Sequence, residues 1–456
     1  MRTVRESAGD GGDANEQLAR AIVAARGNLR LVNLPPHVLM NVTELVYPKI
    51  DDPSFPETPN YELFRKLPVL KRIVIPPGAP VFPEQYLVHA RAEQVVIAES
   101  SIRQKLFLSA TGIKNVVVTA SEEGASSGYS SYAFARSSIE KIVFEDGVKS
   151  IPGGACYQCP NLKSVVMPRS VRRINMYAFA GCTELSYVKM PDSEFEAGDS
   201  AFADCVSLGQ ADLRKCKCEE KSFAGTGLVS VRLECPVVEE EAFLGCGDLR
   251  EVEFGPDVQE IKQNAFKGCR SLQAVDLPFG LSTVGQTAFR NCISLETICV
   301  NNVQSNYMTQ TGVYPFRGCS GVETVYFNFV ATPRERRTAL ARLGLSEKQI
   351  GSDAANGTTS AFAVEGGGGL NGKIATIGVA LGKIGVKTRY KNGQLCAVFE
   401  NGIRVDLAEQ VMEAVGLAGP DAEVVFADKN MARLKSVSDL SQIKAIVFLF
   451  GKERAA

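Results

Sequence analysis

Cysteine is the residue type in this 456-residue sequence that could most readily support chemistry, because thirteen are present. Cys156 and Cys159 form a C-x-x-C pair, and Cys216 and Cys218 are two residues apart. Such spacings occur in redox-active dithiols, and cysteine clusters also bind zinc. A structural zinc site requires four ligands, so each pair alone supplies half of one.

A second candidate site is a glycine-rich stretch near the carboxyl end. Gly367–Lys373 matches the phosphate-binding pattern G-x-x-x-x-G-K, but Ile374 stands where that pattern places the Ser or Thr that holds magnesium. Asp428 follows an apolar run and imitates the second magnesium-binding motif, yet too few residues remain for a doubly wound nucleotide fold. We therefore favour a flexible Gly-rich hinge over a nucleotide site and expect no cofactor.

The sequence offers few residues for histidine-dependent catalysis. His37 and His89 are the only histidines, and both lie in the amino-terminal fifth of the chain. No Ser/His/Asp or Cys/His arrangement is visible, and isolated histidines are more often structural residues. We expect no enzymatic activity.

An internal repeat sets the elements that must position these residues. Phenylalanines recur at intervals of 20 to 23 residues, and six cysteines keep the same step with one coil skipped. The phenylalanines are Phe179, Phe202, Phe223, Phe243, Phe266 and Phe289. The cysteines, called the Cys ladder below, are Cys159, Cys182, Cys205, Cys246, Cys269 and Cys292. A period of about 20 to 29 residues is typical of leucine-rich-repeat solenoids.

The repeat also explains one of the cysteine pairs. Cys156 stands where other coils place the Phe, and Cys159 belongs to the Cys ladder, which carries Ser137 or Thr226 in two coils. Small size is what these ladder residues share, so we predict buried free thiols and no metal site. The pair two residues apart has no such explanation.

The residues after each ladder position predict a strand. Leu272, Val275 and Leu277 precede Pro278, in an L-x-x-V-x-L pattern that recurs along the chain. Alternate residues of so short a run point to one side, as in a β-strand. With fainter copies at both ends, we predict about twelve or thirteen coils of about 23 residues within residues 36–330.

The repeated stretch AFxGCxxLxxVxLP resembles the BspA-like leucine-rich repeat family, strongly from Cys156 to Phe327 and more weakly from Val42 to Ser138. This resemblance implies a curved, β-rich solenoid that is used for binding and adhesion. It implies no catalytic residues.

The physics of one coil supports the same fold. So short a unit cannot bury its own apolar side chains, so the Leu, Val and Phe of each coil must stack on their copies in neighbouring coils. A Gly precedes several ladder cysteines, at Gly181, Gly245 and Gly268. We expect a tight corner with positive φ at these positions.

Short helices are predicted to cap both ends of the solenoid. Residues 1–35 combine a Gly-containing mobile segment with a helix at Asn15–Ala25, which has apolar residues at helical spacing. Residues 331–350 contain a second helix that begins at Pro333 with a capping box around it. Open ends of a solenoid expose apolar columns, which such helices cover.

A second, small domain follows a polar linker at residues 351–360. Residues 361–456 lack the repeat and read as an α+β or α/β domain of unknown role. Asn-Gly turns predict a three-strand meander over Val386–Tyr390, Gln394–Phe399 and Ile403–Leu407. A helix through Leu417 and two further strands, Glu423–Phe426 and Ile443–Phe450, complete the prediction.

The candidate binding residues come from the strands. In each L-x-x-V-x-L strand, the residue between the last two apolar positions points away from the core. From the amino end these residues are Val46, Val74, Val96, Val117, Val143, Val166, Lys189, Asp212, Arg232, Glu253, Asp276, Cys299 and Tyr326. We predict partner binding at Val74, Val96, Val117, Val143, Val166, Lys189, Arg232 and Glu253. The charged residues would set orientation, and either a partner or the C-terminal domain would cover the valines. The alternative is that Val simply favours strands.

Composition narrows the function. A net charge of −1 gives no argument for nucleic acid, and no apolar run is long enough to insert into a membrane. The amino-terminal residues lack a signal peptide's apolar core. We therefore predict an intracellular, cytoplasmic scaffold for protein–protein interaction, or a subunit of a larger assembly. A surface or secreted adhesin is the alternative, and an enzyme or nucleotide binder using the C-terminal domain is less favoured.

Overall fold

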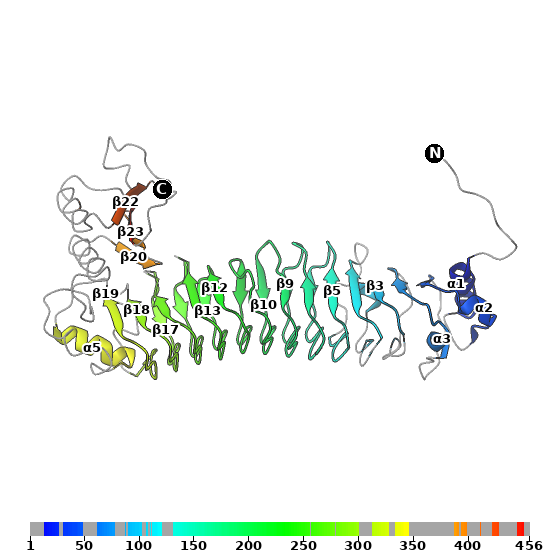
Figure 1. Ribbon diagram of the computed structural model, residues 1–456, viewed down its shortest axis with the longest axis horizontal. Helices are drawn as coiled ribbons and strands as arrows, with labels where there is room; N and C mark the ends of the chain where they lie inside the picture. The colour runs from blue at the N-terminus through cyan, green and yellow to red at the C-terminus, as the bar shows by residue number, and fades with distance from the viewer. Residues whose placement is uncertain are drawn as a thin grey trace. The chain divides into compact units, whose positions relative to one another are not determined.

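The computed structural model of the chain consists largely of short strands, with a few short helices (Figure 1). It divides into two compact units, Met1–Val231 with Ala242–Cys246, and Arg232–Glu241 with Gly247–Ala456. The structure describes residues 13–26, 31–48, 62–77, 87, 90–102, 106–107, 110, 112–120, 131–255, 257–278, 280–300, 312–327, 333–345, 387–391, 394–398, 411, 422–427 and 445–450.

Two parallel sheets run through the first unit. The larger, called the long sheet, joins β1 (Glu44–Val46), β2 (Arg72–Ile75), β3 (Gln94–Ala98), β4 (Asn115–Thr119), β5 (Lys141–Phe144), β7 (Ser164–Val166) and β9 (Tyr187–Lys189). The smaller, called the short sheet, joins β6 (Ser150–Ile151), β8 (Arg173–Ile174), β10 (Phe195–Ala197) and β11 (Cys216–Cys218). Each strand pairs with the strand one coil away, which confirms the predicted solenoid.

The second unit contains two further parallel sheets. One joins β12 (Ser230–Leu233), β14 (Glu251–Phe254), β16 (Ala274–Asp276), β18 (Thr297–Val300) and β19 (Thr324–Phe327). The other joins β13 (Val237–Val238), β15 (Glu260–Ile261) and β17 (Thr283–Val284). Strands and the repeat thus continue through the region where the sequence pattern is strongest.

Each regular coil turns through two left-handed corners. Among the described residues, nine coils from Tyr132 to Gly318 have two positive-φ residues four positions apart. The second of them precedes the ladder position, and φ is 72°, 72° and 79° at Gly181, Gly245 and Gly268, as predicted. The earlier strands β1 to β4 belong to coils without this full corner geometry, so the described residues contain nine regular coils where the sequence predicts twelve or thirteen.

The core is a column of stacked side chains. In the first unit Phe179 stacks on Phe202 with ring centroids 5.2 Å apart, and in the second unit Phe266 stacks on Phe289 at 5.1 Å. All four rings are fully buried. Cys156 occupies the Phe position of its own coil and is also fully buried, as its place in the repeat predicts.

The amino-terminal helix caps the long sheet. Helix α1 (Ala14–Ala24) buries Leu18 and Ile22. The Asn15 side-chain carbonyl accepts hydrogen bonds from the backbone N–H groups of Thr43 and Glu44, at 3.0 and 3.2 Å. These donors lie at the start of β1, the edge strand, so α1 satisfies part of the edge. Two further short helices, α2 (Pro36–Leu39) and α3 (Glu62–Arg65), and a 3-10 turn, η2 (Glu99–Ser101), accompany the first strands.

The predicted carboxyl-terminal cap is also present. Helix α5 (Pro333–Leu343) buries Ala339, Leu340 and Leu343. The backbone N–H of Phe316 donates to the carbonyl of Leu343 at 3.0 Å, which joins the helix end to the last regular coil. The predicted capping-box residue at 332 lies outside the described residues.

Four strands within residues 361–456 are described. They form an antiparallel sheet in the order β20 (Lys387–Lys391), β21 (Gln394–Val398), β23 (Ala445–Phe450) and β22 (Ala422–Ala427). The first hairpin and the two late strands match the prediction. The three-strand meander is wrong, because β21 pairs with β23 on the side where the meander required residues 403–407. Those residues, the predicted helix through Leu417 except position 411, and the linker lie outside the described residues.

Candidate binding surface

Six valines form a continuous row across the long sheet, one from each of its first six strands. The row, called the valine row below, comprises Val46, Val74, Val96, Val117, Val143 and Val166. Consecutive members face each other in the strand register, and Lys189 follows Val166 on β9. Strands β3, β5 and β9 can be followed along this part of the stack in Figure 1. The predicted order of the outward residues is therefore the order in space within this unit.

The valine row is open to solvent at its start and half-buried along its length. Val46 is 45% exposed, whereas the five other valines are half-buried against one another. The alternate residues of the same strands, such as Ile73 and Val95, are fully buried. The row thus lies on the outer side of the sheet, as the alternation predicted.

Charged side chains border the valine row on the side where the strands begin. This polar border comprises Glu44, Lys71, Arg72, Glu93, Lys114, Glu140, Lys141 and Lys163. Arg72 pairs with Glu44 at 2.8 Å, and Glu140 pairs with Lys114 at 2.8 Å and with Lys163 at 3.9 Å. The hydrogen bond between Lys114 and Glu140 raises the pKa of the lysine and lowers the pKa of the glutamate.

The predicted charged residues of the second unit are placed on β12 and β14. Arg232 lies 3.5 Å from Glu253 and 2.9 Å from Glu234, so its charge is already partly neutralised. Asp276 follows on β16, where it is half-buried. Cys299 faces Asp276 in the register, on the outer side of the sheet, but it is only 5% exposed. Burial and then the Asp276 charge raise the pKa of the Cys299 thiol well above its ordinary value.

Asp212, the outward residue between Lys189 and Arg232 in the chain, lies in a segment, residues 208–213, that forms no strand, although β11 follows in the same coil. Its carboxylate accepts hydrogen bonds from the backbone N–H of Arg214 and from the Arg214 guanidinium, at 3.2, 2.9 and 2.6 Å. The apolar residues Leu208 and Leu213 of this coil are still buried. This local loop interrupts the row while leaving the core continuous.

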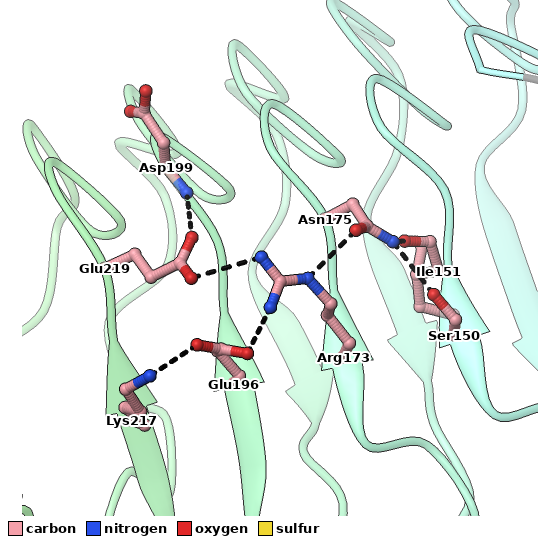
Figure 2. Close-up of polar contacts among 8 residues, drawn as sticks. All are labelled: Ser150, Ile151, Arg173, Asn175, Glu196, Asp199, Lys217 and Glu219. Atoms are coloured by element: carbon pink, nitrogen blue, oxygen red, sulfur yellow. Dashed lines mark hydrogen bonds and ion pairs between the residues drawn. The ribbon is translucent and has the colours of Figure 1, made fainter.

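A charged network on the short sheet was not anticipated from the sequence. Figure 2 shows the guanidinium of Arg173 between the carboxylates of Glu196 and Glu219. The Lys217 ammonium donates to Glu196 at 2.7 Å, and the backbone N–H of Asp199 donates to Glu219 at 3.2 Å (Figure 2). The signal was available, because opposite charges recur about one coil apart along the chain.

Asn175 extends this network towards the preceding coil. Its side-chain N–H groups donate to Ser150 Oγ at 2.8 Å and to the carbonyl of Ile151 at 2.6 Å, while its oxygen accepts from Arg173 Nε (Figure 2). The hydrogen bond from Lys217 lowers the pKa of Glu196, whereas burial raises the pKa of Glu219. The four charges balance, so the network is better suited to joining coils than to attracting a charged ligand.

The cysteines behave as the repeat predicted. All twelve cysteines in the part of the chain that the structure describes are free, and eleven of them are buried, whereas Cys235 is partly exposed. Burial raises the pKa of Cys205 to about 12 and that of Cys246 to about 11. Cys216 and Cys218 have sulfur atoms 3.8 Å apart in β11. Among the described residues, no three His, Cys, Asp or Glu side chains are grouped as a metal site would require.

The C-x-x-C pair is placed across a turn. The backbone N–H of Cys159 donates to the carbonyl of Cys156 at 3.2 Å, and Cys159 Sγ lies 3.6 Å from Ser137 Oγ. The hydrogen bond from Cys156 lowers the pKa of Cys159, while burial raises the pKa of Cys156 well above its ordinary value. His37 is exposed. It belongs to no group of potential metal ligands among the described residues. His89, the Gly367–Lys373 stretch and Asp428 lie outside the described residues.

Comparison with known proteins identifies the repeat. The BspA-type leucine-rich repeat region, in six copies, matches residues 53–152, 127–239 and 236–363. No curated protein matches the sequence. A leucine-rich repeat protein from Bacteroides ovatus shares 21% identity over 62% of this chain and 86% of its own, with a TM-score of 0.38. A leucine-rich cell surface protein from Faecalibacterium prausnitzii shares 16% identity over 65% of this chain and 90% of its own, with a TM-score of 0.29.

No helix among the described residues is both long and apolar enough to cross a membrane. The family match covers more than half of the chain and coincides with the paired strands, the Cys ladder and the left-handed corners. The chain belongs to the BspA-type leucine-rich repeat family.

Proposed function

We propose that this protein is a non-enzymatic, intracellular scaffold that binds a protein partner on the outer face of its long sheet. The valine row supports this proposal most directly, because six apolar side chains in register form a continuous stripe on the face of the long sheet that points away from the core. Apolar stripes of this length on a protein surface are usually covered by something.

An intracellular location is supported by the chemistry of the Cys ladder. Cys205 and Cys246 donate S–H hydrogen bonds to backbone carbonyls, which only a reduced thiol can do. Disulfides form in oxidising compartments, and reduced thiols persist in the cytosol. Cell fractionation with protease protection tests the location, and a protease-sensitive protein on the cell surface would favour an adhesin instead.

Binding is tested by capturing partners from a lysate of the source cells with the full chain. Replacement of Val96 and Val117 by Asp places two charges in the middle of the valine row and should abolish capture of the native partner. Val206→Asp is the matched control, because Val206 is 55% exposed in a turn and not on the long sheet. Equal capture by both variants would refute the proposal that the long sheet is the binding surface.

A variant that keeps the strand intact separates binding from folding. Val96→Thr with Val117→Thr retains the β-branched shape that strands favour and removes apolar surface. We expect weaker capture with an unchanged circular dichroism spectrum.

A further inference from the structure

The valine row has a spacing that selects among possible partners. Neighbouring strands are about 4.8 Å apart, so the five steps from Val46 to Val166 span about 24 Å. An α-helix presents one side chain on a given face in every turn of about 5.4 Å, and about 16 helical residues cover the same length. Side chains on one face of an extended strand are about 6.6 Å apart, and this spacing does not match the distance of about 4.8 Å between neighbouring valines.

We propose that the valine row binds an amphipathic helix of about four to five turns that lies across the strands. The inference rests on the proposed function and names the partner's chemistry. Apolar residues at positions i, i+4, i+7 and i+11 of the helix would each contact one or two neighbouring valines. Lateral packing of this kind needs no backbone hydrogen bond, and the paired strands β2 to β7 offer none.

The polar border specifies the charge of the helix. It contains five basic residues and three acidic ones, and Lys71 and Lys141 are exposed with no ion pair among the described residues. On the opposite side, the residues that directly follow β2, β3, β4, β5 and β7 are Pro76, Glu99, Ala120, Glu145 and Met167, and Glu145 is the one exposed charge among these five. The helix therefore carries acidic residues along the flank next to the polar border. A second copy of this chain would bring the same basic excess.

Lys189 gives the helix a direction. It is exposed and lies next to Val166 in the register, at the end of the valine row. A cation stabilises the carboxyl end of a helix, where the backbone carbonyls have no partner. The bound helix therefore runs from β1 towards β9.

Synthetic peptides of about 16 residues test the charge and the valines by fluorescence anisotropy with the full chain. One peptide carries Leu at the four positions with Glu along one flank, a second carries Lys on that flank, and a third has a scrambled order. We expect the acidic peptide to bind at least tenfold more tightly than the other two. Lys71→Glu with Lys141→Glu should reverse the preference between acidic and basic peptides, and Val96→Asp with Val117→Asp should abolish binding. Equal binding of all three peptides would overturn the proposal.

Crosslinking tests the helix on the native partner. A photoreactive residue replaces Val96 in one variant and Val143 in another. These two positions are two strands apart, or about 9.6 Å. In a bound helix the crosslinked partner residues should lie about six or seven apart in sequence, and in an extended segment about three. A spacing of three, or crosslinks to the valine row of a second copy, would overturn the helix while the proposed binding face stands. Crosslinks from neither position, with capture intact, would refute the binding face itself.

Discussion

The Sγ–H of Cys246 donates a 3.1 Å hydrogen bond to the backbone carbonyl of Phe223, one coil earlier. The same bond recurs from Cys205 to Phe179 at 3.2 Å and, in the second unit, from Cys292 to Phe266 at 3.3 Å. At Thr226 the hydroxyl donates within its own coil, to the carbonyl of Phe223 at 2.9 Å, so this carbonyl accepts from both Thr226 and Cys246. The ladder position therefore requires a small side chain that also carries a hydrogen-bond donor.

Replacing Cys246 tests that requirement. Cys246→Ala removes this donor while the Thr226 hydroxyl still satisfies the Phe223 carbonyl, so it should lower the free energy of unfolding by about 0.5 to 1.5 kcal/mol. Cys246→Ser keeps a donor of similar size and should cost less than the Ala variant. Urea unfolding followed by circular dichroism measures both, and equal losses would show that volume alone matters.

The ladder thiols should be unreactive in the native protein. Buried thiols in apolar surroundings resist modification, and Cys205 and Cys246 are fully buried. Titration with a thiol reagent in the absence of reductant should label most cysteines only after denaturant is added. Ladder disulfides found by mass spectrometry would contradict both this expectation and the intracellular location.

Stability should fall in alkaline solution because of the same thiols. An unfolded cysteine ionises near pH 8.5, whereas the pKa of Cys205 is about 12 and that of Cys246 about 11 in the folded chain. A raised pKa means that the neutral thiol stabilises the fold below about pH 8.5 and that this contribution is lost as the pH rises towards 11 to 12. Urea midpoints measured between pH 7 and about 11 should decline less steeply in a Cys205→Ser, Cys246→Ser variant.

The stacked phenylalanines should dominate the stability of the column. Phe266→Ala and Phe289→Ala each remove a fully buried ring and should cost about 3 to 5 kcal/mol. Tyr187→Ala is the control, because this residue is 55% exposed and a surface change of this kind should cost about 0.5 kcal/mol or less. Losses below about 1 kcal/mol at both phenylalanines would be incompatible with the stacking described.

The left-handed corners can be tested at two glycines that differ in backbone conformation. A Cβ added at Gly245 or at Gly209 would meet no atom within 4 Å, but only Gly245 has a positive φ, of 72°. Gly245→Ala should therefore cost about 1 to 2 kcal/mol through backbone strain alone. Gly209→Ala should be neutral or stabilise the fold by up to about 1 kcal/mol, because it restricts the unfolded chain. Equal effects in thermal or urea unfolding would refute the strain argument.

Most of the fold could be predicted from the sequence because a solenoid repeats one local rule. The spacing of Phe266 and Phe289 and the alternation within Leu272–Leu277 define the column and the strands without long-range information. The order of β20, β21, β23 and β22 could not be predicted in the same way, because β21 pairs with a strand about fifty residues away. Nothing in the local pattern distinguishes that pairing from a meander.

The order of the outward residues along the candidate binding surface could be predicted from the sequence, whereas their exposure and local hydrogen bonds could not. Strict alternation placed Val96 and Val117 on the outer side of the sheet. The same rule placed Cys299 on the outer side but could not predict its exposure, because a side chain on the outer side can still be covered by its neighbours. Asp212 is exposed as predicted, but residues 208–213 form no strand and Arg214 binds this carboxylate locally. The donor requirement of the Cys ladder was visible in Ser137 and Thr226, which share a hydroxyl as well as small size.

The bonds from Asn15 to the edge strand have a consequence for polymerisation. Strand β1 is the first strand of the long sheet, and Asn15 occupies the N–H groups of Thr43 and Glu44 where the next coil of a longer stack would lie. Without α1, the exposed edge could pair with the terminal strand of another molecule, and such head-to-tail contacts extend into filaments because they do not close. Helix α1 thus covers part of the edge at which such end-to-end pairing would begin.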